Sequence, residues 1–178
     1  RALRDTQSRV RSMALLHQLL FERSELSAVD LGRYLQRLAA LLRDSYLGQA
    51  PQVQIEVRVP EEGLQVGMEQ AIPCGLMVNE LVTNALKHGF PDGRAGYVQV
   101  SAACIEAGAT LCLRVEDDGI GLPFGLSPGG ATRGLGLQLL PLLAEQCQGR
   151  LSLCGGEAGG TAAELLMPLL LDTQRSAS

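Results

Sequence analysis

The chain has 178 residues, 46% of them hydrophobic, and a formal net charge of −4, so its length suits one domain with a substantial core. The acidic balance and the absence of long basic runs argue against nucleic acid as the main partner. No apolar run reaches the length of a membrane span and the N-terminus does not resemble a signal peptide, so we expect no membrane contact by this segment.

The cysteines and aromatic residues indicate the character of the core. The sequence has five cysteines, an odd number, and none of them has Cys-x-x-Cys spacing. Cys74, Cys104, Cys112 and Cys147 lie in apolar stretches, which predicts small core residues in a reduced, cytoplasmic protein. With three Phe, three Tyr and no Trp, the core is expected to be aliphatic.

The first third of the chain predicts two helices and two strands. Residues 1–21 form a heptad-like apolar stripe, typical of one helix of a hairpin or bundle. After a polar break over residues 22–28, Asp30 is expected to cap a second helix over residues 31–46. Alternating apolar residues then predict two strands, over residues 53–59 and 64–68.

Residues 74–90 predict the helix around which the domain is organised. Pro73 suits the first helical position, and Gly89 is expected to end the helix in the left-handed conformation. Apolar residues recur along it at helical spacing, so one face is expected to be buried.

A second, polar stripe follows the same helix. Glu80, Asn84 and His88 are four residues apart and therefore share one face, with Lys87 one step round the helix. A solvated helix face would explain these residues. The functional interpretation is a magnesium–nucleotide site, because oxygen ligands suit Mg²⁺, which is often shared with substrate phosphates. The helix alone leaves both interpretations open.

The second half of the chain alternates strands, loops and one helix. After a turn signal at residues 91–94, a hairpin is predicted over residues 97–104 and 110–115. The Gly/Pro/Ser-rich residues 124–133 indicate a mobile loop of lid length. A helix from Gly134 to about Cys147 follows. Two strands, over residues 151–153 and 161–167, then complete the domain, and residues 172–178 are expected to form a disordered tail. These elements predict an α+β fold, a two-layer sandwich.

Two glycine motifs carry candidate chemistry. Asp117 directly follows a strand, where a carboxylate can accept a hydrogen bond from an exocyclic amine such as that of adenine. Gly119 and Gly121 would let the backbone approach a flat ring closely. The alternative is a plain turn, since Asp-Gly is a common turn dipeptide.

The second motif, Gly134-Leu135-Gly136, opens a helix after the glycine-rich loop. Free N–H groups and the helix dipole make such a position an anion site suited to phosphates, to which Arg133 could add a charge. The alternative is a loop that merely needs glycine. The motif is neither a dinucleotide fingerprint nor a Walker A loop.

Taken in order, these motifs and Gly160-Thr161 on a late strand resemble the Bergerat ATP-binding fold of the GHKL superfamily. That fold is shared by gyrase, the ninety-kilodalton heat-shock chaperones, mismatch-repair ATPases and histidine kinases, and the resemblance covers about residues 31–167. Residues 72–93 are similar to the sensor histidine kinases of two-component signalling, in the subgroup whose phosphoacceptor helix reads His-Arg-Val-Lys-Asn. Residues 9–17 are similar to the second helix of that subgroup's dimerisation hairpin.

The resemblance implies ATP and Mg²⁺ as ligands and a role for each matching residue. Asn84 would bind Mg²⁺ and Glu80 would hold a metal-bound or attacking water, so Glu80 and Lys87 are the catalytic candidates. The other implied contacts are with phosphate or ribose (Lys87, His88), adenine N6 (Asp117, with Thr161 through water), the ring (Gly119, Gly121) and the phosphates (Arg133, Gly134, Leu135, Gly136).

The implied activity is transfer of the ATP γ-phosphoryl group to a histidine, for relay to the receiver domain of a response regulator. Residues 1–25 would belong to the dimerisation hairpin of a homodimer and residues 26–171 to the ATP-binding domain. The hairpin helix that carries the acceptor is expected to lie outside this chain, so the chain alone is not expected to phosphorylate itself.

Two further features depart from the family pattern. Of the aromatic box between the glycine motifs only Phe124 is present. His17 is followed by Gln18 rather than by an acidic residue that could act as a base, so it is expected to be a packed or interface histidine. The alternatives to a histidine kinase are a serine kinase or ATPase of the same fold, such as an anti-sigma factor, or a non-catalytic nucleotide-binding module.

Overall fold

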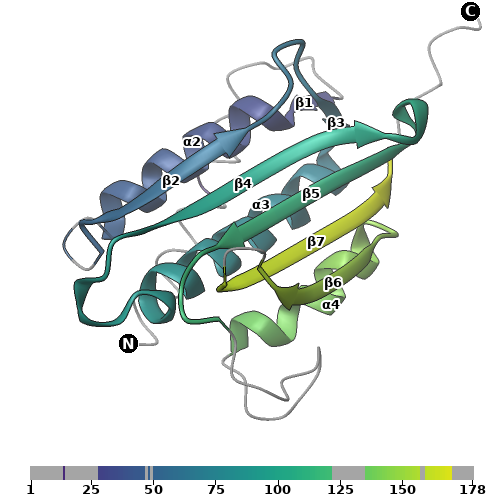
Figure 1. The fold of residues 1–178 in the computed structure, drawn as a ribbon. Helices are drawn as coiled ribbons and strands as arrows, with labels where there is room; N and C mark the ends of the chain where they lie inside the picture. The colour runs from purple at the N-terminus through teal and green to yellow at the C-terminus, as the bar shows by residue number, and fades with distance from the viewer. Residues whose placement is uncertain are drawn as a thin grey trace, which may run out of the picture.

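The computed structural model describes residues 28–169 apart from 47, 49, 122–134, 157 and 158, together with residue 14. In this part of the chain a five-stranded sheet is covered on one face by the helices α2 (Leu31–Tyr46), α3 (Met68–Asn84) and α4 (Leu135–Gln146) (Figure 1). The predicted two-layer α+β fold is confirmed. The predicted helix over residues 1–21, the loop over 124–133 and the tail over 172–178 lie outside the described residues.

The main sheet is mixed, in the order β2-β4-β5-β7-β6. Its strands are β2 (Val53–Arg58), β4 (Gly96–Ile105), β5 (Thr110–Asp117), β6 (Arg150–Gly155) and β7 (Thr161–Pro168). Only β2 and β4 pair in parallel, and the other neighbours are antiparallel. Because parallel strands cannot be joined by a tight turn, the chain between β2 and β4 crosses over through α3. The predicted hairpin is confirmed as β4–β5.

A second, two-stranded sheet pairs β1 (Ala28–Asp30) with β3 (Gln65–Gly67). The predicted polar break over residues 22–28 was therefore wrong at residue 28, which already belongs to strand β1. A strand of three residues is too short for a period of two to be visible in the sequence. The predicted cap of α2 is confirmed, since the backbone N–H of Arg33 donates to Asp30 Oδ1 at 3.1 Å.

Helix α3 differs from its prediction at both ends. It begins at Met68, so Pro73 lies inside the helix and is buried rather than at the first helical position. Gly89 does not take the left-handed conformation. Instead, α3 continues into a π-helical turn, η1 (Ala85–Gly89). The helix ends at Phe90, whose φ is −125°. The left-handed residue comes later, at Asp92, with φ of 58°.

The core between the helices and the sheet is largely aliphatic, as expected. The buried face of α2 carries Leu31, Leu35, Leu38, Leu42 and Tyr46. Tyr34 lies on the same face against α3, where a Cβ on Gly75 would overlap its ring. Burial raises the pKa of the Tyr34 phenol. Among the described residues, no helix is both long and apolar enough to cross a membrane.

Two of the four predicted core cysteines are buried, Cys74 and Cys147. Cys104 is exposed, because the last three residues of β4 extend beyond the covered part of the sheet. Cys112 is half-buried, since it alternates with the inward residues of β5 and so lies on the face away from the helices.

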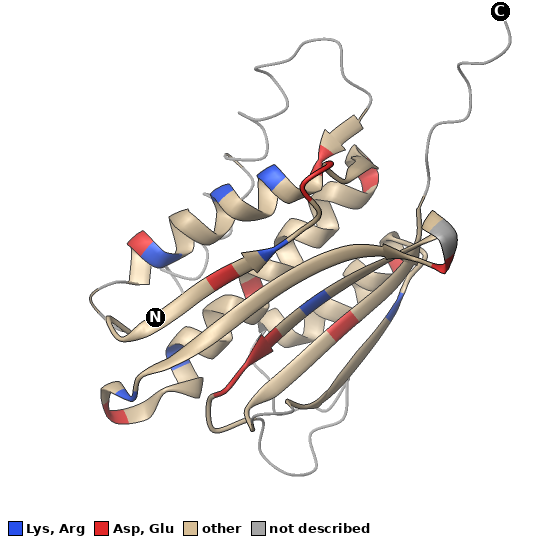
Figure 2. Cartoon of the chain, turned by 45° about the horizontal axis from the view of Figure 1, so that its top comes forward, with Lys and Arg blue, Asp and Glu red and all other residues tan. Residues whose placement is uncertain are grey.

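The face of the sheet that points away from the helices carries basic and acidic residues (Figure 2). On this face Arg114 Nη2 lies 3.0 Å from Glu116 Oε2, and Arg114 Nη1 lies 3.7 Å from Glu164 Oε2 on the neighbouring strand. Both pairs are partly exposed, and the second one links β5 to β7. They lie apart from the helix face of the sheet, where the predicted site residues of α3 gather.

Candidate functional site

The polar stripe of α3 is more buried than a solvated helix face would be. Glu80 is only 7% exposed and Asn84 is half-buried, whereas His88 on η1 is exposed. The neighbouring Asn79, only 1% exposed, places its amide Nδ2 3.4 Å from Glu80 Oε1. Sequence reasoning missed Asn79, although an amide next to a candidate catalytic carboxylate is a recognisable signal. Burying a carboxylate is costly unless polar partners compensate it, so Glu80 belongs either to a ligand site or to a buried hydrogen-bond network.

Asn84, the last residue of α3, has an unsatisfied group. Its Nδ2 is buried and has no hydrogen-bond partner within the described part of the chain, as is also true of Thr83 Oγ1. An unpaired buried amide is costly, and natural structures keep one mainly where a ligand completes the site. The amide oxygen of Asn84 and the Glu80 carboxylate are hard oxygen donors, so this end of α3 fits a Mg²⁺ ion shared with nucleotide phosphates.

Lys87 lies on the π-helical turn and is directed toward α2. Its Nζ is 5.7 Å from the centroid of the Tyr46 ring, within the range of a cation–π interaction. A π-helical turn has i→i+5 hydrogen bonds and rotates less per residue than an α-helical turn. For this reason Lys87 departs from the stripe of Glu80 and Asn84. The predicted contact of Lys87 with phosphate or ribose stays a prediction.

Asp117 closes β5 and is only 8% exposed. Its Oδ1 accepts a hydrogen bond from the Gly119 N–H at 2.9 Å. Burial raises the pKa of the Asp117 carboxyl, while hydrogen bonds from the backbone of Gly119 and Thr161 act in the opposite direction. The backbone of Thr161 thus forms a hydrogen bond with Asp117. The predicted contact between Thr161 and Asp117 through water stays a prediction. A buried carboxylate at a strand end can read an exocyclic amine.

The turn after Asp117 packs directly on the end of the site helix. A Cβ on Gly119 would lie 2.6 Å from the carbonyl oxygen of Gly89, a distance that no side chain tolerates. The Ile120 N–H donates to the same oxygen at 2.9 Å. Gly121 has φ of 76°, a conformation that favours glycine. The close approach therefore requires glycine at position 119, whereas a Cβ on Gly89 would make only ordinary contacts, 3.6 Å from Asp117 Oδ1 and 3.7 Å from the Gly119 Cα.

Asp118, which sequence reasoning did not single out, fixes the other side of this turn. Its Oδ1 accepts a hydrogen bond from the Tyr97 N–H at 2.8 Å, and its Oδ2 lies 3.9 Å from Arg94 Nη2. Asp118 therefore ties the turn to the start of β4 and to the segment that follows η1. The second aspartate of an Asp-Asp-Gly sequence was the available signal.

The predicted phosphate-binding residues lie largely outside the described part of the chain. This holds for Phe124, Arg133 and Gly134, and for His17 at the other end of the sequence. Leu135 begins α4, and Gly136 follows it as a buried residue of the first turn. Their proposed contacts with phosphate stay predictions.

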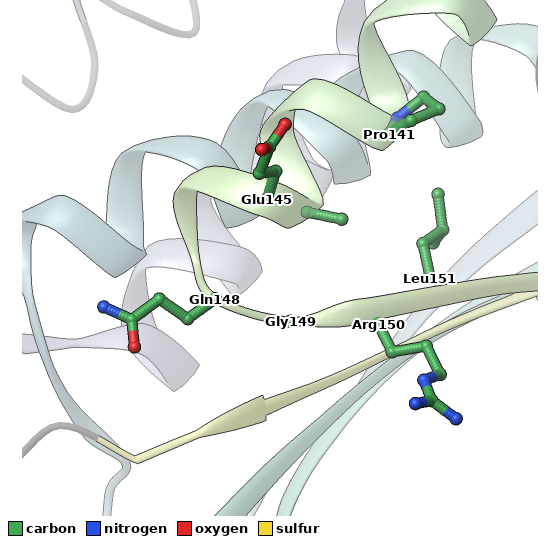
Figure 3. Close-up of a pocket in the computed structure, with 7 residues that line it drawn as sticks. Pro141, Glu145, Gln148, Gly149, Arg150 and Leu151 are labelled. Atoms are coloured by element: carbon green, nitrogen blue, oxygen red, sulfur yellow. The ribbon is translucent and has the colours of Figure 1, made fainter.

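An open cavity of about 410 Å³ between α4 and β6 contains none of the predicted site residues. It is lined by Pro141, Ala144, Glu145, Gln148, Gly149, Arg150 and Leu151. Figure 3 shows the side chains of Glu145, Gln148 and Arg150 pointing in different directions. A ligand site usually combines an apolar pocket with polar groups that converge on it. This cavity therefore does not compete with the site at α3 and β5.

Comparison with known proteins agrees with this geometry. Residues 69–171 match the family of histidine kinase-, DNA gyrase B- and HSP90-like ATPases, and residues 1–46 match a histidine kinase family. Blue-light-activated histidine kinase 2 of Erythrobacter litoralis is 36% identical over 119 residues, which are 65% of this chain and 33% of that protein. Sensor histidine kinase PdtaS of Mycolicibacterium smegmatis is 31% identical over 169 residues, which are 94% of this chain and 33% of that protein. The chain spans about a third of the length of these relatives.

Solved structures give the same result. The histidine kinase domain of the Erythrobacter litoralis EL346 blue-light activated kinase has a TM-score of 0.79 at 28% identity, covering 93% of this chain and 75% of that one. The ATP-binding domain of PrrB from Mycobacterium tuberculosis has a TM-score of 0.64 at 28% identity, and the match covers 81% of this chain and 97% of that one. Since the matched residues 69–171 make up more than half of the 178, the chain belongs to the histidine kinase-, DNA gyrase B- and HSP90-like ATPases, and among them to the sensor histidine kinases.

Proposed function

We propose that this chain binds Mg–ATP and serves as the catalytic domain that transfers the γ-phosphoryl group to a histidine side chain. The phosphoryl group would then pass to the receiver domain of a response regulator. One observation carries the proposal: the backbone contact of Gly119 with Gly89 joins the buried carboxylate of Asp117 to the helix of Glu80 and Asn84. A base-reading group and a metal-binding group are thereby held in one site.

The residues have distinct roles in this proposal. Asp117 accepts a hydrogen bond from the exocyclic amine of adenine, and Gly119 and Gly121 leave room for the ring. Asn84 would hold Mg²⁺, and Glu80 would orient a metal-bound or attacking water. When bound, Mg²⁺ neutralises charge that develops on the phosphates, so catalysis depends mainly on positioning and electrostatics. His88, Arg133, Gly134, Leu135 and Gly136 complete the contacts with ribose and phosphates.

The assembly is part of the same proposal. Residues 1–25 would form part of the dimerisation hairpin of a homodimer, residues 26–171 the ATP-binding domain and residues 172–178 a tail. A cytoplasmic location fits a partner that carries a receiver domain.

Calorimetric titration with ATP, with and without Mg²⁺, tests the binding step. We expect ATP to bind with an affinity that rises when Mg²⁺ is present. Absence of ATP binding under both conditions would reject the proposal.

Incubation with γ-labelled ATP tests the transfer step. We expect no labelled histidine on the 178-residue chain, because His88 lies on the nucleotide helix and His17 lacks an acidic neighbour. A longer protein that contains the acceptor helix should acquire label that survives alkali but not acid, as phosphohistidine does. ATP binding without label in such a protein would indicate a non-catalytic module instead.

A further inference from the structure

We propose that Asp118 is a positioning residue for adenine recognition. Its carboxylate fixes the turn that follows Asp117, and so determines how strongly the site prefers adenine to other bases. The inference rests on the proposed function and deepens its base-reading step, since Asp118 acts through Asp117 and not on the nucleotide itself. The observation behind it is a hydrogen bond of 2.8 Å from the Tyr97 N–H to Asp118 Oδ1.

This hydrogen bond takes the place of a main-chain bond of the sheet. The ladder between β4 and β5 ends where Val98 pairs with Asp117. A next pair of Tyr97 and Asp118 would exchange two main-chain hydrogen bonds if the ladder continued. One of them is present, from the Asp118 N–H to the Tyr97 carbonyl oxygen at 3.3 Å. For the other, the Tyr97 N–H donates to the side chain of Asp118, where a continued ladder would use its main-chain carbonyl.

The replacement lets the main chain leave the sheet at once. Asp118 is the first residue after β5, and the N–H of the next residue, Gly119, already turns back to Asp117 Oδ1 at 2.9 Å. A main-chain bond from the Asp118 carbonyl to β4 would instead keep the chain extended along the sheet. The turn that orients the Asp117 carboxylate therefore depends on the side chain of Asp118.

The start of β4, which donates this bond, is itself closely packed. A Cβ on Gly96 would overlap the Phe90 ring and lie 2.5 Å from Asp118 Oδ1. Phe90 follows η1 and is only 8% exposed. The carboxylate of Asp118 thus fixes the turn against a part of the chain that is packed on the end of the site helix.

The hydrogen bond, and not the neighbouring ion pair, is expected to give Asp118 its role. Asp118 Oδ2 lies 3.9 Å from Arg94 Nη2, and the Arg94 side chain is 46% exposed. Ion pairs open to solvent contribute little to stability, whereas a hydrogen bond from a backbone N–H to a carboxylate is one of the stronger kinds. Asparagine, which keeps an oxygen acceptor without the charge, should therefore be able to replace Asp118.

The test compares ATP with inosine triphosphate, which has the same ribose and phosphates but a carbonyl oxygen in place of the exocyclic amine. Calorimetry on the 178-residue chain with Mg²⁺ should show that Asp118→Ala lowers affinity for ATP about three- to tenfold and affinity for inosine triphosphate less than about twofold. Asp118→Asn should keep the preference for ATP. Asp118→Glu keeps the charge but displaces the acceptor by one methylene group, so it should lose preference as Asp118→Ala does.

Asp30→Ala is the matched control. Asp30 also accepts a hydrogen bond from a backbone N–H, that of Arg33 at 3.1 Å, and its Oδ2 lies 3.4 Å from Arg33 Nε. Its strand, β1, pairs with β3, which leads into the start of α3, whereas the candidate site lies at the other end of that helix. Asp30→Ala should therefore lower the temperature of unfolding and leave the ratio of the two affinities unchanged.

Four outcomes would overturn the inference. The first is an unchanged preference for ATP in Asp118→Ala, or in Asp118→Glu if the alanine variant does not fold. The others are equal losses for the two nucleotides, a loss in Asp118→Asn as large as in Asp118→Ala, and the same change of preference in Asp30→Ala. A wild-type chain that binds both nucleotides equally would reject the reading of the amine by Asp117, and the inference with it. A wild-type chain that binds neither would instead reject the proposed function.

Discussion

Gly119 rests on the carbonyl oxygen of Gly89, where an added Cβ would lie 2.6 Å from that oxygen and 2.8 Å from Asp117 Oδ1. The contact joins two segments that are thirty residues apart in sequence (119 − 89). On one side stands the helix of Glu80 and Asn84, and on the other the turn of Asp117. The distance between the two halves of the candidate site is therefore set by backbone atoms, which cannot adjust as side chains do.

The contact predicts that Gly119→Ala damages both stability and nucleotide binding. The added methyl group must push the turn away from η1, and overpacking of this kind costs about 1–3 kcal/mol. Thermal unfolding and ATP titration measure the two effects. Gly155→Ala is the matched control, because a Cβ at Gly155 would meet nothing within 4 Å and its φ is not positive. Equal behaviour of the two variants would show that the backbone contact is unimportant.

Asp117→Asn should separate recognition of the base from recognition of the phosphates. We expect it to weaken adenine nucleotides by about 1–3 kcal/mol, the cost of an unpaired buried polar group. Affinity for free pyrophosphate should change little, because pyrophosphate has no base. Competition titrations with ATP and pyrophosphate test this difference. Equal losses for both ligands would mean that Asp117 does not contact the base.

The same carboxyl group predicts a pH dependence of stability. Burial raises the pKa of Asp117, so the folded state binds this proton more tightly than the unfolded state. As pH rises from the ordinary aspartate value through the raised pKa, the contribution of Asp117 to the free energy of unfolding falls, and above that window it is constant. Urea unfolding at a series of pH values should show the wild type losing stability relative to Asp117→Asn across the window. A difference that rises with pH would contradict the assignment.

Asn84 and Thr83 form a natural pair for testing the metal assignment. Both carry a buried polar atom that has no partner within the described residues, so neither substitution should cost more than about 1 kcal/mol of stability. Asn84→Ala should abolish the dependence of ATP affinity on Mg²⁺, whereas Thr83→Val should preserve it. Calorimetry with and without Mg²⁺ is the measurement. Unchanged Mg²⁺ dependence in Asn84→Ala would show that another group holds the metal.

The fold could be predicted from sequence wherever a local pattern was long enough. Helix α2 has the predicted bounds because a cap at Asp30 precedes sixteen residues of clear helical period. Strand β1 has only three residues and was missed for that reason. The start of α3 was misplaced because proline is common at the first helical turn, yet Pro73 is the sixth residue of this helix. There it removes one hydrogen bond, to Glu69 in the first turn.

The candidate site was predictable as a set of residues but not as an arrangement. Spacing of four predicts that Glu80 and Asn84 share a face of a helix. The π-helical turn at Ala85–Gly89 and the contact of Lys87 with Tyr46 depend on packing between elements far apart in sequence. The same is true of Gly119, which must be glycine because its backbone packs on the backbone of Gly89. Such contacts have no periodic signature.

The parallel pairing of β2 with β4 has a consequence for the order of folding. Val53 pairs with Gly96, so this pairing closes a loop that contains the whole of α3, whereas β4 and β5 join through a short turn. Closing a long loop costs entropy before its contacts form, so we expect β2 to join the sheet after the rate-limiting barrier. In stopped-flow measurements Ile55→Val should accelerate unfolding and leave the folding rate nearly unchanged. Slower folding in this variant would contradict that order. The edge strand β2 then governs how long each folded molecule survives, and not how quickly it forms.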